Sequence, residues 1–276
     1  MVEIGLGVRK VKRGDPVVLH WMKGSGIDSA TPQFTWQGRP LNAGWVTTFS
    51  EYTIASENRL TPIPSDVKSE VACLLGCAVT TGLGIVFNDA NLKPGESIAV
   101  FGAGGVGLNV VQGAALANAY PIVAVDINED KLQKAREFGS THTLHAGIGD
   151  TRALLLELSH GRGFDVTVDT SGNTQVFQLA YSTTASSGRT IMAGVLDHQA
   201  PITIDAFPLH FGRRIIGSHG GGTRPDLDIP RYLQLHRLAR LKLEEQITHR
   251  YPLTRINEAI DSVRKGGAGK CVLSLC

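Results

Sequence analysis

Short apolar segments alternate with amphipathic helical segments through the middle of this 276-residue chain. SIAVFG, PIVAVD and FDVTVD are typical of the apolar segments, and NEDKLQKAREFG of the helical ones. Strands that alternate with helices of this length form βαβ units and a parallel sheet. Apolar residues at successive positions, as in IAVF, are typical of strands covered on both faces. The sequence therefore predicts an α/β fold with a doubly wound parallel sheet. Asp165 and Asp169, at the two ends of FDVTVD, are expected to form hydrogen bonds at the strand ends rather than an acid–base pair.

A glycine ladder directly follows the strand SIAVF and directly precedes an apolar helix. Gly102, Gly104 and Gly107 form the pattern G-x-G-x-x-G. In this context the glycines allow a tight turn, close approach of a pyrophosphate to the backbone, and close packing of the helix on the strand. Gly105 and Val106 lie at the helix N-terminus, where free N–H groups and the positive end of the helix dipole attract phosphate. The ladder predicts a dinucleotide site.

An acidic residue closes the next strand along the chain. Asp126 lies 19 residues after Gly107, where a carboxylate can accept hydrogen bonds from both ribose hydroxyls. The same carboxylate would repel a 2′-phosphate, so it favours NAD over NADP. An ordinary strand-to-helix turn that needs glycines is the alternative, but strand, ladder, helix and acid occurring together argue against it. We therefore predict that this site binds NAD.

The composition excludes several classes of partner. The net charge is only +2, from 27 basic and 25 acidic residues, so no nucleic acid or anionic membrane is expected as a partner. Four cysteines are too few for a disulfide framework in a chain of this size. We identify neither a signal peptide nor an apolar run of membrane-spanning length. A cytoplasmic protein that acts on a small molecule is the expectation.

The two ends of the chain lack the regular alternation of strand and helix patterns that its middle shows. Residues 1–66 contain short extended runs such as VVLHW and WVTTFSEYTIA, which predict small antiparallel β structure. VEIGLGV and KRGDPVVL are expected to form two strands joined by a turn, as though the chain opens in the middle of a sheet. Ser65 is a candidate N-cap for the helix that follows. We expect a nucleotide domain over 79–220 and a second domain built from 1–78 and 221–276.

The segment CLLGCAVTTGLG resembles the zinc-dependent medium-chain alcohol dehydrogenases, in which a similar Gly-Cys-x-x-x-Thr-Gly run precedes the nucleotide fold. The agreement continues in order through FGAGGVGL, VAVDINEDK, FGRRIIGS and ITHRYPLTRINEAIDSVRKG, and so covers essentially the whole chain. Within the family, the branch that includes the glutathione-dependent formaldehyde dehydrogenases is the most similar. The resemblance implies a Rossmann domain beside a partial GroES-like β-rich catalytic domain. It also implies an oxidoreductase that converts an alcohol to an aldehyde or ketone and passes the hydride to NAD.

The resemblance further implies roles for individual residues. Cys77 corresponds to a protein ligand of the catalytic zinc, and Thr81 to a residue packed against the nicotinamide. In such enzymes the zinc acts as a Lewis acid on the substrate oxygen. Lys131 corresponds to a basic residue beside the adenosine ribose, and Lys270 to one that reaches the pyrophosphate. Gly194 and Val195 correspond to residues whose backbone contacts the carboxamide.

Several family features have no counterpart in this sequence. The first Cys ligand, the Gly-His-Glu ligand motif and the proton-relay residues all precede the position that corresponds to VEIGLGV. The stretch that corresponds to the structural-zinc lobe contains no cysteine, so structural zinc is expected to be absent. A catalytic zinc needs three protein ligands, and Cys77 is one. We therefore expect NAD binding with weak or no zinc-dependent turnover from this chain.

Two other functions remain open from the sequence. One is a zinc-free medium-chain reductase of the quinone oxidoreductase kind, whose usual preference for NADPH conflicts with Asp126. The other is a non-catalytic NAD-binding protein. The family resemblance also implies a homodimer joined edge to edge at the nucleotide domain, with PITIDAFPLHFGRRIIG at the interface.

Overall fold

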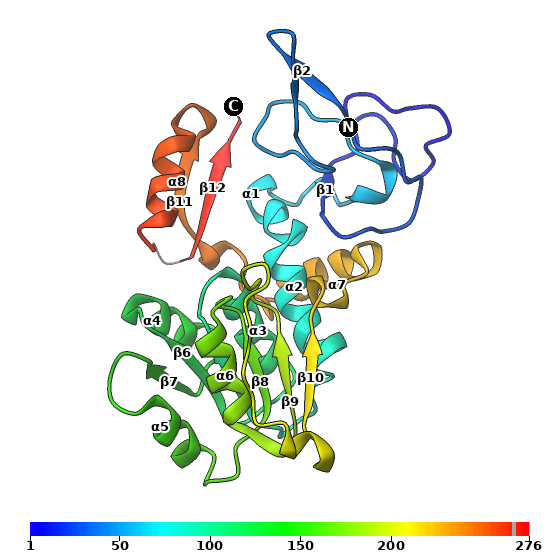
Figure 1. Cartoon of the computed structure of the whole chain (residues 1–276). Coiled ribbons are helices and arrows are strands. Elements are labelled where there is room, and N and C mark those ends of the chain that lie inside the picture. Colours follow the sequence, from blue (N-terminus) through cyan, green and yellow to red (C-terminus); the bar gives the residue numbers. More distant parts are fainter. Residues whose placement is uncertain (267–268, 276) are drawn as a thin grey trace. The chain divides into compact units, whose positions relative to one another are not determined.

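The computed structural model describes residues 1–266 and 269–275. The chain divides into two compact units, one made of Met1–Thr80 with Thr223–Cys276 and the other of Thr81–Gly222 (Figure 1). The first boundary falls inside helix α2 (Ala78–Gly84), and the second directly follows the short turn η5 (Gly220–Gly222).

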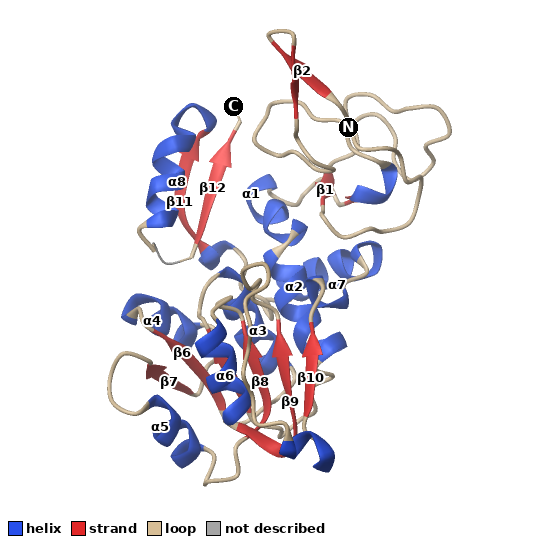
Figure 2. Ribbon diagram, viewed as in Figure 1, coloured by secondary structure: helices blue, strands red, loops and turns tan. Residues whose placement is uncertain are grey.

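The middle unit contains a six-stranded sheet in which every pairing between the described strands is parallel (Figure 2). The expected doubly wound α/β sheet is therefore confirmed. The strand that enters first lies inside the sheet, with later strands added on both sides of it; in such sheets ligands bind beyond the carboxyl ends at this switch point. In sheet order the strands are β10 (Arg214–Gly217), β9 (Thr184–Met192), β8 (Phe164–Asp169), β5 (Ile98–Phe101), β6 (Ile122–Asp126) and β7 (His142–His145).

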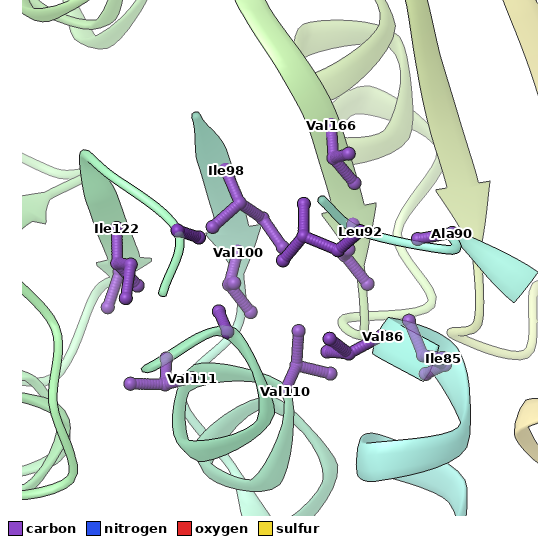
Figure 3. Close-up of a cluster of buried hydrophobic side chains, with 14 of the residues drawn as sticks. Ile85, Val86, Ala90, Leu92, Ile98, Val100, Val110, Val111, Ile122 and Val166 are labelled. Atoms are coloured by element: carbon purple, nitrogen blue, oxygen red, sulfur yellow. The ribbon is translucent and has the colours of Figure 1, made fainter. Parts of the chain in front are cut away.

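Helices cover both faces of this sheet because its strands are apolar on both sides. On β5, Ile98 and Val100 face a cluster that includes Val110 of the helix that follows β5 (Figure 3). Ala99 and Phe101 face a second cluster on the opposite side. Full burial of a valine, isoleucine or phenylalanine side chain such as these stabilises the fold by about 1.5–3 kcal/mol. The helices are α3 (Gly105–Leu116) and α4 (Glu129–Glu137) on one face, and α5 (Thr151–Leu158) and α6 (Thr174–Ser182) on the other.

The unit built from both ends of the chain contains short two-stranded sheets. β1 (Val17–Leu19) pairs antiparallel with β4 (Leu60–Pro62), and β2 (Phe34–Trp36) pairs antiparallel with β3 (Arg39–Leu41). Near the C-terminus, a parallel pair is joined by a helix. The remaining elements are α1 (Ser69–Ala72), α7 (Pro225–Arg237), β11 (Ile247–Pro252), α8 (Ile256–Arg264) and β12 (Lys270–Ser274). Single turns complete the structure: η1 (Glu57–Arg59), η2 (Cys73–Gly76), the π-helical η3 (Ile85–Asp89), η4 (Phe207–Phe211), η6 (Glu244–Gln246) and η7 (Leu253–Arg255).

Three local predictions for the N-terminal part are wrong. VEIGLGV is not a strand: the N–H of Val8 donates to the Gly5 carbonyl, and Gly7 has φ +82°, so the backbone turns. WVTTFSEYTIA also forms no strand, and its large side chains, such as Tyr52 at 75% exposed, have no core face to cover. Ser65 does not cap a helix, because residues 64–67 form a turn and α1 follows Lys68 as its N-cap. Small antiparallel β structure is present here, but in fewer segments than expected.

Within the part of the chain that the structure describes, no single helix is both long and apolar enough to cross a membrane. One bent pair, Ser69–Gly76 with Ala78–Asp89, meets the length and composition criteria when the two segments are taken together.

Candidate functional site

The glycine ladder forms the turn between β5 and α3, and its three glycines are needed for different reasons. Gly102 has φ +94°, a left-handed conformation that strains residues with a side chain. A Cβ on Gly107 would lie 1.8 Å from the carbonyl oxygen of Gly102, so the helix packs directly on the turn. A Cβ on Gly104 would meet nothing within 4 Å, so the space in front of this residue is open. A turn, a packing contact and an open approach are the features that a dinucleotide needs from this loop.

The helix that follows presents an anion-binding end. Gly104 is the N-cap of α3, with an extended backbone and no side chain to cap the helix. The first N–H groups of a helix, here those of Gly105, Val106 and Gly107, have no acceptor within the helix. Together with the positive end of the helix dipole, they favour a phosphate at this position.

Asp126, the last residue of β6, is tied directly to the glycine loop. Its Oδ2 accepts a hydrogen bond of 2.7 Å from the N–H of Ala103, and its Oδ1 accepts one of 3.0 Å from the N–H of Asn128. Asn128 in turn caps α4 by accepting from the N–H of Lys131 at 3.2 Å. A carboxylate has about four acceptor positions, so the half-buried Asp126 keeps capacity for ribose hydroxyls. Asp126 thus lies beside the glycine loop, and the backbone of Lys131 is linked to it through Asn128.

The loop after β9 lies against the turn after β8. The N–H of Gly194 donates to the carbonyl oxygen of Asp169 at 2.8 Å. A Cβ on Gly194 would lie 2.2 Å from the nitrogen of Gly172, and one on Gly172 would lie 2.5 Å from the carbonyl oxygen of Val195. The Val195 side chain is 91% exposed. Since all strands of this sheet are parallel, this loop lies on the same carboxyl edge as the glycine ladder.

Thr170 was not predicted as a site residue from the sequence, although its hydroxyl is hydrogen-bonded to the glycine loop. Its Oγ1 donates to the carbonyl oxygens of Phe101 and Gly102, each at 3.0 Å. It would also collide with a Cβ on Gly102, at 2.7 Å. The only signal in the sequence was its position directly after the strand FDVTVD, and such a position does not reveal which loop the side chain meets.

The two aspartates of β8 both form hydrogen bonds at its ends, as predicted. Asp165 Oδ2 accepts from the N–H of Ser97 at 2.8 Å and from its hydroxyl at 2.7 Å. Asp169 Oδ1 accepts from the N–H of Ser171 at 3.0 Å and from its hydroxyl at 2.6 Å. The sequence did not show that Asp169 is completely buried.

Cys77 lies between η2 and α2, with a non-helical backbone at φ −151°. Its thiol is exposed, which argues against a role as a small buried hydrophobic group. Its carbonyl oxygen accepts a hydrogen bond from the Thr80 hydroxyl at 2.9 Å. Across residues 1–266 and 269–275, no three His, Cys, Asp or Glu side chains are grouped so that they could hold a metal ion. The described residues therefore do not form a three-ligand zinc site by themselves.

Two further predicted residues lie on separate elements. Thr81 is half-buried in α2, and its carbonyl oxygen would be 2.4 Å from a Cβ on Gly221. Lys270 is the first residue of β12 and is half-buried. Neither residue's predicted contact with a cofactor is tested by these positions.

Comparison with known proteins identifies the family. A family model for zinc-binding dehydrogenases matches residues 105–237. S-(hydroxymethyl)glutathione dehydrogenase of Escherichia coli O1:K1 / APEC is 34% identical over 301 residues, which include 99% of this chain and 81% of that protein. The chain belongs to the zinc-type medium-chain alcohol dehydrogenases. It is therefore related to oxidoreductases over nearly its whole length.

Solved structures of this dehydrogenase family share the fold. Benzyl alcohol dehydrogenase from Acinetobacter calcoaceticus superposes with a TM-score of 0.88 at 25% identity, covering 99% of this chain and 81% of that one. For 2R,3R-butanediol dehydrogenase from Bacillus subtilis the TM-score is 0.79 at 25% identity, with coverage of 100% and 78%. These relatives confirm the expected fold class, a Rossmann sheet with a GroES-like β-rich part.

Proposed function

We propose that this dehydrogenase binds NAD(H) on the glycine loop and transfers a hydride between an alcohol and the nicotinamide, with an aldehyde or ketone as the other product. The hydrogen bond from the N–H of Ala103 to Asp126 Oδ2 carries the proposal, because it holds a carboxylate beside the phosphate-binding turn. A carboxylate in this place accepts from the ribose hydroxyls of NAD and repels the 2′-phosphate of NADP.

Different residues of the site would bind different parts of the cofactor. The backbone from Gly102 to Gly107 would hold the pyrophosphate at the N-terminus of α3. Asp126 would orient the adenosine ribose, with Lys131 as a basic residue beside it. For Lys270, the family resemblance implies a contact with the pyrophosphate. The backbone at Gly194 and Val195 would contact the carboxamide, and Thr81 would pack against the nicotinamide ring. When bound, the nicotinamide supplies the hydride acceptor, and the protein orients it toward the substrate.

Cys77 would supply one ligand of a catalytic zinc, in keeping with its exposed thiol. A thiolate is a strong zinc ligand, but tight binding in a catalytic site uses three protein ligands. We therefore propose an incomplete zinc site, with weak metal binding and slow turnover by this chain, and no structural zinc.

The substrate is proposed to be a small-molecule alcohol or aldehyde, as the names of the relatives suggest for those proteins. We also propose a cytoplasmic homodimer. Its interface would use β10, which lies at one edge of the six-stranded sheet. Phe207 and Phe211, on the turn before β10, are 68% and 65% exposed and would be covered by the second subunit. Sedimentation that shows only monomer at micromolar concentration would exclude the dimer.

Absorbance at 340 nm tests the reaction, with NAD and a panel of primary and secondary alcohols, before and after addition of zinc. We expect slow NADH formation that rises with added zinc and is lost in Cys77→Ser. Stoichiometric, tightly bound zinc in the purified chain would contradict the incomplete site. Turnover with NADPH in the absence of zinc would point to a quinone-type reductase. Tight NADH binding without turnover on any substrate would point to a non-catalytic protein.

A further inference from the structure

A fully buried carboxyl group lies at the carboxyl end of β8. Asp169 is 0% exposed, and its Oδ1 accepts the two hydrogen bonds from Ser171. Its Oδ2 is also buried and forms no hydrogen bond of good geometry with the described residues, although the N–H of Gly172 approaches the carboxyl group. Burial raises the pKa of this carboxyl group, although hydrogen bonds from Ser171 and from the N–H of Gly172 oppose the shift. A buried carboxyl oxygen without a well-formed hydrogen bond is destabilising, so its presence at this position calls for an explanation.

Asp169 joins two loops through both its main chain and its side chain. Its carbonyl oxygen accepts from the N–H groups of Ala193 at 2.9 Å and Gly194 at 2.8 Å. Its Oδ1 holds Ser171 in the turn after β8, and its Oδ2 would lie 3.0 Å from a Cβ on Gly194. The carboxyl group therefore fills the junction between the turn after β8 and the loop after β9.

The two loops are in unusually close contact at this junction. A Cβ on Gly194 would lie 2.2 Å from the nitrogen of Gly172, a distance at which only glycine is accommodated. A small displacement of either loop would therefore move the other. Val195, the next residue, has an exposed side chain and a backbone that packs on Gly172. The position of the Gly194–Val195 backbone thus depends on the turn that Asp169 holds.

We propose that Asp169 is a positioning residue, whose carboxyl group fixes the loop after β9 so that Gly194 and Val195 hold the nicotinamide half of NAD. This inference rests on the proposed function, in which that loop contacts the carboxamide. The adenosine half is bound by a different structure, the glycine loop with Asp126, which is supported by Thr170. Loss of the Asp169 carboxyl group should therefore weaken binding of the whole dinucleotide more than binding of its adenosine half.

Calorimetric titration with NADH and with ADP-ribose, which lacks the nicotinamide, separates the two effects. In Asp169→Ala we expect NADH affinity to fall about tenfold or more, as when a ligand loses one or two hydrogen bonds, with ADP-ribose affinity changed less than about twofold. Asp169→Asn preserves the shape and the acceptor for Ser171, so its NADH affinity should stay within about threefold of the unchanged protein. If Asp169→Ala fails to fold, Asp169→Ser tests the same loss of the carboxyl group, because serine keeps a small polar side chain that is shorter than that of aspartate.

Asp165→Ala is a matched control on the same strand. Asp165 also accepts an N–H and a hydroxyl hydrogen bond from one serine, but at the opposite end of β8. This variant should lose stability without changing the ratio of NADH to ADP-ribose affinity. Three outcomes would overturn the inference: Asp169→Ala loses affinity for NADH and ADP-ribose equally, it loses affinity for neither ligand, or Asp169→Asn loses as much NADH affinity as Asp169→Ala does. If the unchanged protein binds no NADH, the proposed function itself fails.

Discussion

Two glycines of the ladder should respond in opposite ways to the same substitution. Gly107→Ala places a methyl group 1.8 Å from the carbonyl oxygen of Gly102, whereas Gly104→Ala places one in open space. Gly104 also has an ordinary extended backbone, with φ −78° and ψ −166°, which alanine adopts readily. Gly107→Ala should therefore damage the fold, and Gly104→Ala should leave the fold intact but obstruct the pyrophosphate.

The size of each effect follows from these distances. Cβ atoms essentially never approach other heavy atoms within 3.0 Å, so in Gly107→Ala the helix or the turn must move by more than 1 Å. The obstacle is backbone rather than a flexible side chain, so we expect a loss of about 3 kcal/mol, at the upper end for overpacking. Gly104→Ala should change stability by less than about 0.5 kcal/mol. Its NADH affinity should nevertheless fall about tenfold or more, because the backbone can no longer approach the pyrophosphate closely.

Urea unfolding measures the stability of both variants, and calorimetry measures their affinity for NADH. We expect stability and affinity to separate, with a large loss of stability in Gly107→Ala and a loss of affinity without loss of stability in Gly104→Ala. If Gly104→Ala binds NADH as tightly as the unchanged protein does, the phosphates do not lie against this loop. If Gly107→Ala is fully stable, the close packing of α3 on the turn is not what requires glycine.

Two further predictions concern ion pairs, Arg189 with Glu96 and Lys10 with Asp226. Arg189 is 7% exposed and donates to both carboxylate oxygens of Glu96, at 2.9 and 2.5 Å. Arg189→Met should destabilise the protein by about 3 kcal/mol in urea unfolding, because it leaves the Glu96 carboxylate without its ion-pair partner. Its partner in the β10–β9 register, the exposed Arg214, is the control, and a stability loss in Arg214→Met equal to that in Arg189→Met would contradict this account. Burial alone would raise the pKa of Asp226, but hydrogen bonds from Lys10, Ser25 and Thr61 lower it to about 2. Because the folded pKa lies below the unfolded value, this half-buried group stabilises the fold above pH 4, by about 1 kcal/mol once solvent screening is allowed for. This contribution is lost as the pH falls from about 4 to 2. Asp226→Asn should therefore be less stable at pH 7 and show a shallower loss of stability over that range; an unchanged acid profile would refute the assignment.

The geometry of the glycine loop could be predicted from the sequence because its determinants are local. Gly102, Gly104 and Gly107 act within one turn, and Asp126 ends the next strand, so their spacing along the chain already carries the geometry. The role of Asp169 could not be predicted, since its burial depends on two loops that meet only in the folded sheet. Nothing in the string FDVTVD distinguishes that aspartate from Asp165.

The N-terminal segments show why other parts of the fold could not be predicted. Alternating and β-branched residues, as in WVTTFSEYTIA, describe a segment that would suit a sheet, but a strand also needs a neighbour to pair with and a core face to cover. In the structure these side chains are largely exposed, and the segment forms no strand. Likewise, the motif around Cys77 indicates the family, whereas a zinc site depends on ligands brought together from distant segments.

Titration of the purified chain with NADH and, in parallel, with NADPH tests the central claim most directly. We expect one saturable NADH site and at least about tenfold weaker NADPH binding, because the Asp126 carboxylate repels the 2′-phosphate. Asp126→Asn, which removes the charge but keeps the shape, should weaken NADH binding and reduce the discrimination against NADPH. Failure to bind NADH, or equal affinity for the two cofactors in the unchanged protein, would contradict the account.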